Sequence, residues 1–194
     1  FELTEAQTRA TFLKQFEEMV AETPRLDGIF VPGGDPGHNA PEHVMPLLED
    51  LAKRAKAKVW LSLQGFNRER ENFVYRWIKD QQPVWLGGLV AGPSSPPAAR
   101  SRENLPQQYG IRLYPDITHN KICQFQVPGL DQAIALTLGR EAINPRPAEM
   151  ARIHNRYAGL STGFITYSDG VHDDINKAIF SALGWDPALS LIHI

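Results

Sequence analysis

The feature that most constrains the fold is an alternation of short β-rich runs with helical patterns along the chain. The β-rich runs hold β-branched and aromatic residues, and the patterns between most of them repeat apolar residues every three to four positions. The candidate strands are 28–31, 59–63, 88–90, 111–114, a weaker one at 142–143, and 163–167. The helical patterns cover 3–20, 44–55, 73–78, 133–138, 150–157 and 175–183. An interval under about 30 residues is the size of a βα unit, so we expect an α/β fold with a parallel sheet.

Two architectures use such units. About six βα units would form most of a (β/α)8 TIM-type barrel, which takes roughly 250 residues when complete. An open doubly wound sheet is the alternative, and it normally carries a Gly-rich phosphate-binding loop after its first strand. The loop after 28–31 does hold glycines, but Pro36 removes an N–H where phosphate would need one. We therefore expect an incomplete barrel over residues 1–187.

Both ends of the chain suggest a piece of a longer protein. The sequence opens at Phe1 and enters a helical pattern at once, with no signal segment before it. Localisation is therefore left open, and the sequence is compatible with a secreted or a periplasmic protein. The last residues, 188–194, are expected to be a non-native tail because 189–194 resembles translated adapter sequence, the alternative being a short genuine strand.

Composition excludes several classes of protein. Twenty Lys and Arg against 22 Asp and Glu give a net charge of -2, without the basic excess of a nucleic-acid-binding protein. No apolar run approaches the roughly 18 residues of a membrane span. The single cysteine, Cys123, has no second cysteine for a disulfide or a zinc site and is expected to be a buried thiol. We expect a globular protein without a cofactor, and the oligomeric state is left open.

Candidate site residues follow the strands, because a parallel barrel places its site at their carboxyl ends. Tyr114, Asp116 and His119 form the densest cluster, and Gln64 offers an amide to sugar hydroxyls. Turn formation and helix capping are the alternative roles for the acids, and Trp60 and Tyr114 fit either a sugar-binding floor or the core. The candidates in chain order are Asp35, His38, Gln64, Tyr114, Asp116, His119, Asn144 and Arg146.

The run after the last strand is the most acidic candidate. Tyr167 is followed closely by Asp169, Asp173 and Asp174. Crowded carboxylates repel one another, which would raise the pKa of at least one toward the range of a general acid. The alternative for Asp173 and Asp174 is capping of the helix that follows, whose positive end favours anions.

Several phrases resemble an uncharacterised group of bacterial glycoside-hydrolase-like barrels. They are Val-Pro-Gly-Gly-Asp-Pro-Gly-His, Trp-Leu-Gly-Gly, Tyr-Pro-Asp-Ile-Thr-His, Gly-Arg-Glu-Ala-Ile-Asn-Pro-Arg-Pro, and Tyr-Ser-Asp-Gly with Asp-Asp-Ile-Asn-Lys, spread over 26–187. More distantly, the Asp173-Asp174 pair is similar to the adjacent aspartates of β-N-acetylglucosaminidases that use substrate-assisted catalysis. In those enzymes one aspartate orients the substrate acetamide and the other is the general acid. The resemblance implies carbohydrate chemistry.

The leading hypothesis is a glycoside hydrolase that uses a pair drawn from the five aspartates above as acid and base or nucleophile. The alternatives are a non-catalytic glycan-binding barrel and a metal-dependent hydrolase using His38, His119, His172 and a carboxylate. The barrel hypothesis also predicts that one concave face holds Asp35, Gln64, Tyr114, Asp116, Asn144 and Asp169.

Overall fold

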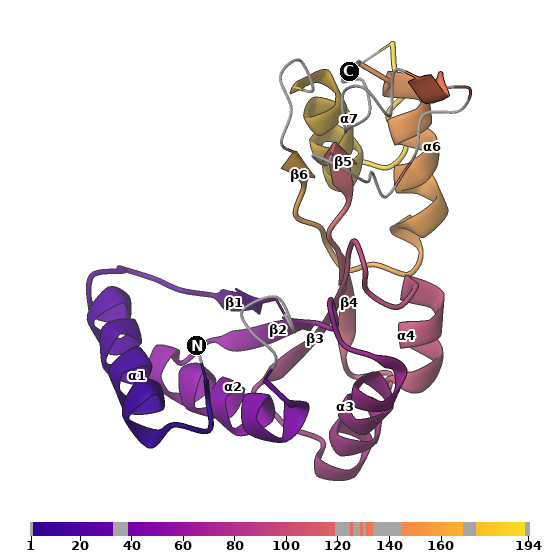
Figure 1. Cartoon of the computed structure of the whole chain (residues 1–194). Helices are drawn as coiled ribbons and strands as arrows, with labels where there is room; N and C mark the ends of the chain where they lie inside the picture. The colour runs from indigo at the N-terminus through magenta and orange to yellow at the C-terminus, as the bar shows by residue number, and fades with distance from the viewer. Residues whose placement is uncertain are drawn as a thin grey trace. The chain divides into compact units, whose positions relative to one another are not determined.

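The computed structural model describes residues 2–32, 39–118, 131–133, 145–168 and 174–192, together with Phe125 and Gly129 (Figure 1). For 116–118 and 167–168 it describes the backbone path. The chain divides into two compact units, residues 1–110 and 111–194. The predicted histidine and acidic positions 35, 38, 119, 169, 172 and 173 lie outside the described residues, as do Cys123 and Asn144.

The first unit alternates helices with parallel strands, which confirms the α/β prediction. A four-stranded sheet has the order β1-β2-β3-β4, and β2 pairs in parallel with both β1 and β3. The order follows the chain, whereas a doubly wound sheet reverses its order at a switch point. Figure 1 shows α2 and α3 on the same side of the β1–β3 strands. The elements are α1 (Ala6–Ala21), β1 (Gly28–Val31), α2 (Pro41–Ala55), β2 (Lys58–Ser62), α3 (Arg68–Gln81), β3 (Leu86–Ala91), α4 (Ala98–Asn104) and β4 (Gly110–Leu113).

Local sequence explains where the helices of this unit begin and end. Helix α2 starts with Pro41, whose fixed φ suits a first helical position, and its N-cap is Ala40. Helix α3 is capped by Asn67, whose Oδ1 accepts a hydrogen bond from the Arg70 amide at 3.0 Å. A turn follows β3 at 92–95, where the Ser95 backbone amide donates to Gly92 O.

Alternation along β2 builds the core of the first unit. Val59, Leu61 and Leu63 are at most 1% exposed, and α2 packs against this strand. On the other face the Trp60 ring lies over β3, and a side chain at Gly87 would come within 2.6 Å of it. Trp60 is 9% exposed. These contacts place Trp60 in the core, the second of the two roles that the sequence allowed.

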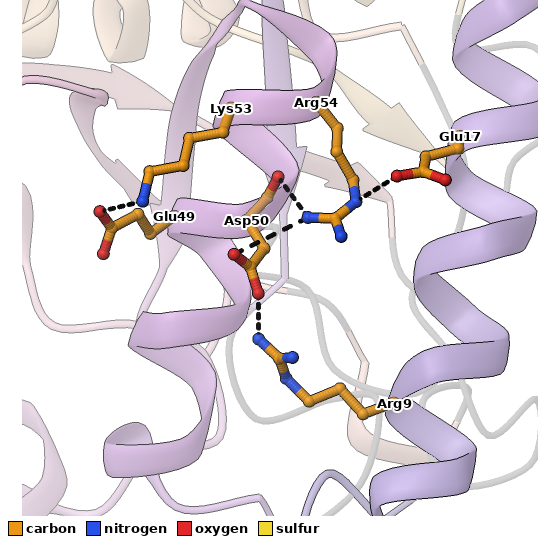
Figure 2. A network of polar contacts seen from close by, with 6 residues as sticks. All are labelled: Arg9, Glu17, Glu49, Asp50, Lys53 and Arg54. Carbon is orange, nitrogen blue, oxygen red and sulfur yellow. Dashed lines mark hydrogen bonds and ion pairs between the residues drawn. The ribbon is translucent and has the colours of Figure 1, made fainter.

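An ion-pair network joins α1 to α2 (Figure 2). Asp50 of α2 accepts a hydrogen bond from Arg9 of α1. Arg54 of α2 donates to Glu17 of α1 at 2.6 Å, and its Nη1 lies 3.7 Å from Asp50 Oδ1. Asp50 and Arg54 are each only about one third exposed, at 29% and 32%, so the network is partly shielded from water.

We expect Asp50→Asn to cost about 1 kcal/mol of unfolding free energy in low salt, since Asp50 pairs with two arginines. The loss should shrink in about 1 M NaCl, where the screening length falls to about 3 Å. Glu49→Gln is the matched control, because Glu49 pairs with Lys53 along α2 on the exposed surface and contributes little. Urea unfolding midpoints at both salt concentrations measure this. Equal losses for the two variants would contradict a role for the network.

The second unit contains two helices that pack against each other and a parallel pair of short strands. The strands are β5 (Asp116–Thr118) and β6 (Tyr167–Ser168), and the helices are α6 (Pro147–Ala158) and α7 (Asp174–Trp185). Met150 and Phe180 are fully buried between the helices. Gly184 lets α7 approach Phe164, because a side chain there would come within 2.1 Å of the Phe164 ring. The helices predicted around 150–157 and 175–183 are confirmed.

The expected last strand, 163–167, is more broken than its sequence indicates. Phe164 forms a single parallel bridge with Leu113, and β6 then pairs with β5 in a register that shifts between Asp116 and Thr118. Residues 111–118 thus pair directly with 162–168. The 142–143 run itself is outside the described residues.

Candidate functional site

The structure brings two of the predicted site segments together in the second unit. Strand β5 pairs in parallel with β6, and the register sets Asp116 opposite Tyr167 and Thr118 opposite Ser168. These segments are 51 positions apart in the sequence, yet their backbones are neighbours. Because the strands are parallel, their carboxyl ends meet at one edge, and the sequence that continues beyond each contains His119 and Asp169.

A half-buried arginine, Arg112, precedes β5 in the sequence. Arg112 lies in β4, two residues before Tyr114, which is itself half-buried. Burial lowers the pKa of Arg112. Gly163 faces Arg112, with the Arg112 Nε 3.8 Å from where a side chain at Gly163 would begin. Arg112 was not predicted as a site residue; the signal in the sequence was a charged residue between the apolar residues Ile111 and Leu113 of a strand.

Asp174 begins α7 and is highly exposed. Its side chain is 94% exposed, and Oδ1 lies 3.7 Å from Lys177 Nζ on the next turn. An acid in the first turn of a helix is favoured by the positive end of the helix dipole. This placement fits the helix-start role better than that of a general acid, which needs a desolvated carboxyl.

Arg146 is held by protein groups. Its backbone amide donates to Oδ1 of the buried Asn176 at 2.7 Å, and its Nη2 donates to the Phe125 carbonyl at 2.8 Å. Arg146 is also the residue preceding α6. These contacts tie the start of α6 to α7, so the structure gives the predicted sugar-binding arginine a packing role.

In the first unit, Gln64 follows β2 as predicted and is positioned by hydroxyl groups. Ser62, fully buried at the end of β2, has its Oγ 3.1 Å from Ser95 Oγ in the loop after β3. The same Oγ accepts a hydrogen bond from the backbone amide of Gln64 at 3.2 Å. The two serines thus join neighbouring loops at the carboxyl edge of the sheet. Neither serine was predicted from the sequence, because serine is common in turns.

The described parts of the chain contain no cluster of three or more His, Cys, Asp or Glu side chains that could hold a metal ion. Within those same parts, no helix is both long enough and apolar enough to cross a membrane. No protein family, no curated protein and no solved structure matches the chain.

Proposed function

We propose that the chain belongs to a (β/α)8 barrel of the glycoside-hydrolase type, which acts on a glycan or glycoside through Asp116 and Asp169. The consecutive order of β1 to β4 supports the barrel, because right-handed crossovers between consecutive parallel strands leave every helix on one face. The other face of the sheet is then left to form the inside of a barrel.

The observation that carries the proposal is the parallel pairing of β5 with β6. Neighbouring strands lie about 4.8 Å apart. Asp116 belongs to one strand, and Asp169 is the next residue after the other. Glycosidases place their two carboxyl groups about 5–9.5 Å apart, a spacing that side chains from adjacent strands can span. A pair on neighbouring strands is therefore a better fit than the adjacent Asp173 and Asp174.

The resemblance to β-N-acetylglucosaminidases gives the first substrate class to test. Aryl glycosides, including an aryl N-acetyl-β-glucosaminide, report cleavage directly by colour. We expect Asp116→Asn and Asp169→Asn each to slow turnover by about 10²-fold, because an amide cannot transfer the proton or act as nucleophile. Asp174→Asn is the matched control and should leave the rate unchanged, since its exposed carboxylate lies near Lys177.

Melting temperatures of all three variants separate lost chemistry from lost folding. Full activity in both Asp116→Asn and Asp169→Asn would overturn the assignment of the pair. Saturable glycan binding without turnover of any glycoside would instead indicate a glycan-binding barrel, and turnover abolished by a chelator would indicate the metal-dependent alternative.

A further inference from the structure

Two segments of the second unit run side by side in parallel, and they include β5 and β6. Leu113 bridges Phe164, and the same offset joins Asp116 to Tyr167 in the two strands. The backbone between these pairs keeps that register, because the Ile165 amide donates to Leu113 O at 2.9 Å. One register thus places the residues of the two segments opposite one another.

The two faces of this pair of segments differ in burial. Successive side chains of a strand point to opposite faces. Ile111 and Leu113 are buried, and the ring of Phe164 packs against rings of both α6 and α7. Arg112 and Tyr114 alternate with these residues and are half-buried. They therefore belong to the face that is turned away from the two helices.

Asp116 belongs to the same face as Arg112. The alternation continues through the buried Pro115, and β5 begins at Asp116. Ile165, which is opposite Tyr114 in the register, is 40% exposed, so this face is open in part. The path from Arg112 to Asp116 is about 13 Å at a rise of about 3.3 Å per residue. A sugar ring with a hydrogen bond at each end spans a similar length, so both residues can contact one sugar.

Space remains beside the Arg112 side chain. The residue opposite it is Gly163, which has no side chain. Among the described residues, only Nε and Cγ of Arg112 lie within 4 Å of the point where a side chain at Gly163 would begin, at 3.8 Å and 4.0 Å. Gly163 thus leaves room next to the arginine for a small group of a ligand.

The chemistry of arginine selects a ligand group with two anionic oxygens. The guanidinium stays charged at neutral pH and presents five N–H donors in a planar fork, so a contact to the protein leaves other donors for a ligand. The fork matches the two oxygens of a carboxylate, and such bidentate pairs are stronger than neutral hydrogen bonds. Burial also lowers the pKa of Arg112, because the charged form is less well hydrated there. An anion gains more from such a group than a neutral sugar does.

We propose that Arg112 binds the carboxylate of an acidic sugar, so that the sugar whose bond is cleaved is a uronic acid. The inference rests on the proposed function, because it names the substrate class of the same site. Arg112 holds the far side of the sugar, and Asp116 lies beside the bond that is cleaved. Arg112 thus determines specificity and takes no part in proton transfer.

Glucuronic acid, glucose and sulfate are the probes, each titrated in low salt into the whole 194-residue chain and followed by two-dimensional NMR. The two sugars differ only at C6, where one has a carboxylate and the other a hydroxymethyl group. We expect glucuronic acid to shift the resonances of 111–114 and 163–165 saturably and to bind about tenfold more tightly than glucose, the ratio that one charge-assisted hydrogen bond supplies. Sulfate should bind more weakly than glucuronic acid, because it lacks the sugar ring.

Two variants test the role of the guanidinium. Arg112→Gln removes the charge and should equalise glucuronic acid and glucose. Arg112→Lys keeps the charge without the fork and should retain part of the preference. Arg152→Gln is the matched control, because Arg152 pairs with Glu149 on the exposed surface of α6, and it should leave both affinities unchanged. Circular dichroism checks that each variant is folded.

Three results would each overturn the proposal: equal binding of the two sugars by the parent chain, sulfate binding as tight as that of glucuronic acid, or an unchanged preference in folded Arg112→Gln. The first two need no variant, so the proposal can fail even where the substitution prevents folding.

Hydrolysis separates this proposal from the proposed function. Aryl glucuronides and aryl glucosides, compared as α and as β anomers, differ in the same group at C6. We expect kcat/KM to be at least about tenfold higher for the glucuronide. Equal hydrolysis of the two would overturn the acidic-sugar assignment and leave the glycosidase proposal standing. Preferential binding of glucuronic acid without hydrolysis of either would support Arg112 as the carboxylate-binding residue and overturn the glycosidase proposal.

Discussion

Gly88→Ala is expected to destabilise the first unit by about 3 kcal/mol or more, through backbone strain and a steric clash. Gly88 has φ +154°, which an L-residue rarely adopts, and a Cβ there would lie 1.9 Å from the Gly110 carbonyl oxygen. That oxygen belongs to β4, so neither partner can rotate away as a side chain could. The adjustment must move β3 or β4 itself.

The other glycines of the sheet provide a graded comparison. A Cβ at Gly87 would meet the Trp60 ring at 2.6 Å, whereas one at Gly28 would meet its nearest atoms at an ordinary 3.6 Å. We therefore expect the loss of stability to follow the order Gly88→Ala, then Gly87→Ala, then Gly28→Ala, with the last close to zero. Urea unfolding of the three variants measures it. A Gly28→Ala loss as large as that of Gly88→Ala would show that the close approach of β3 and β4 is not the cause.

Phe180→Ala should cost about 3–5 kcal/mol, the usual loss when a buried aromatic ring is removed from a packed core. Phe180 is fully buried, and its ring contacts those of His154 and Phe164 with centroid separations of 5.6 Å and 5.7 Å. Removal of the ring leaves a void between α6 and α7. Amide hydrogen exchange should accelerate in both helices of the second unit.

Trp185→Ala is the matched control, because Trp185 is also an aromatic residue of α7 but is 91% exposed. Its removal should change the unfolding free energy by no more than about 0.5 kcal/mol. Comparable losses in the two variants would mean that Trp185 is covered in solution by something beyond the described contacts.

Much of the secondary structure could be predicted because the hydrophobic period was strong. The apolar pattern of 44–55 became α2, and the β-rich run 59–63 became the buried strand β2. Helix α4 was missed. Its sequence, Ala-Ala-Arg-Ser-Arg-Glu-Asn, is short and has no apolar stripe, and it is held instead by tertiary contacts such as Tyr75 with Ser101, whose hydroxyl oxygens lie 3.0 Å apart.

Some features of the candidate site could likewise be predicted from the sequence, and others could not. Position near the end of a strand predicted that Asp116 and Asp169 belong to the same region, and the structure sets β5, which holds Asp116, beside β6. Residue type alone did not indicate the contacts that Arg146 and Asp174 make. Arginine and aspartate bind sugars in some folds, but here one ties α6 to α7 and the other begins a helix in contact with solvent. Burial and hydrogen-bond partners distinguish these roles, and a single sequence contains neither.

By itself, the sequence determined the α/β class, most of the helices and the parallel sheet, because local periodicity sets which face of each element must be buried. The tertiary structure decided which strands are neighbours, and it set Asp116 opposite Tyr167. It also decided that Trp60 packs over Gly87 and that Phe164 packs against Gly184. These features depend on contacts between residues far apart in the chain, and packing selects them only when the whole core forms.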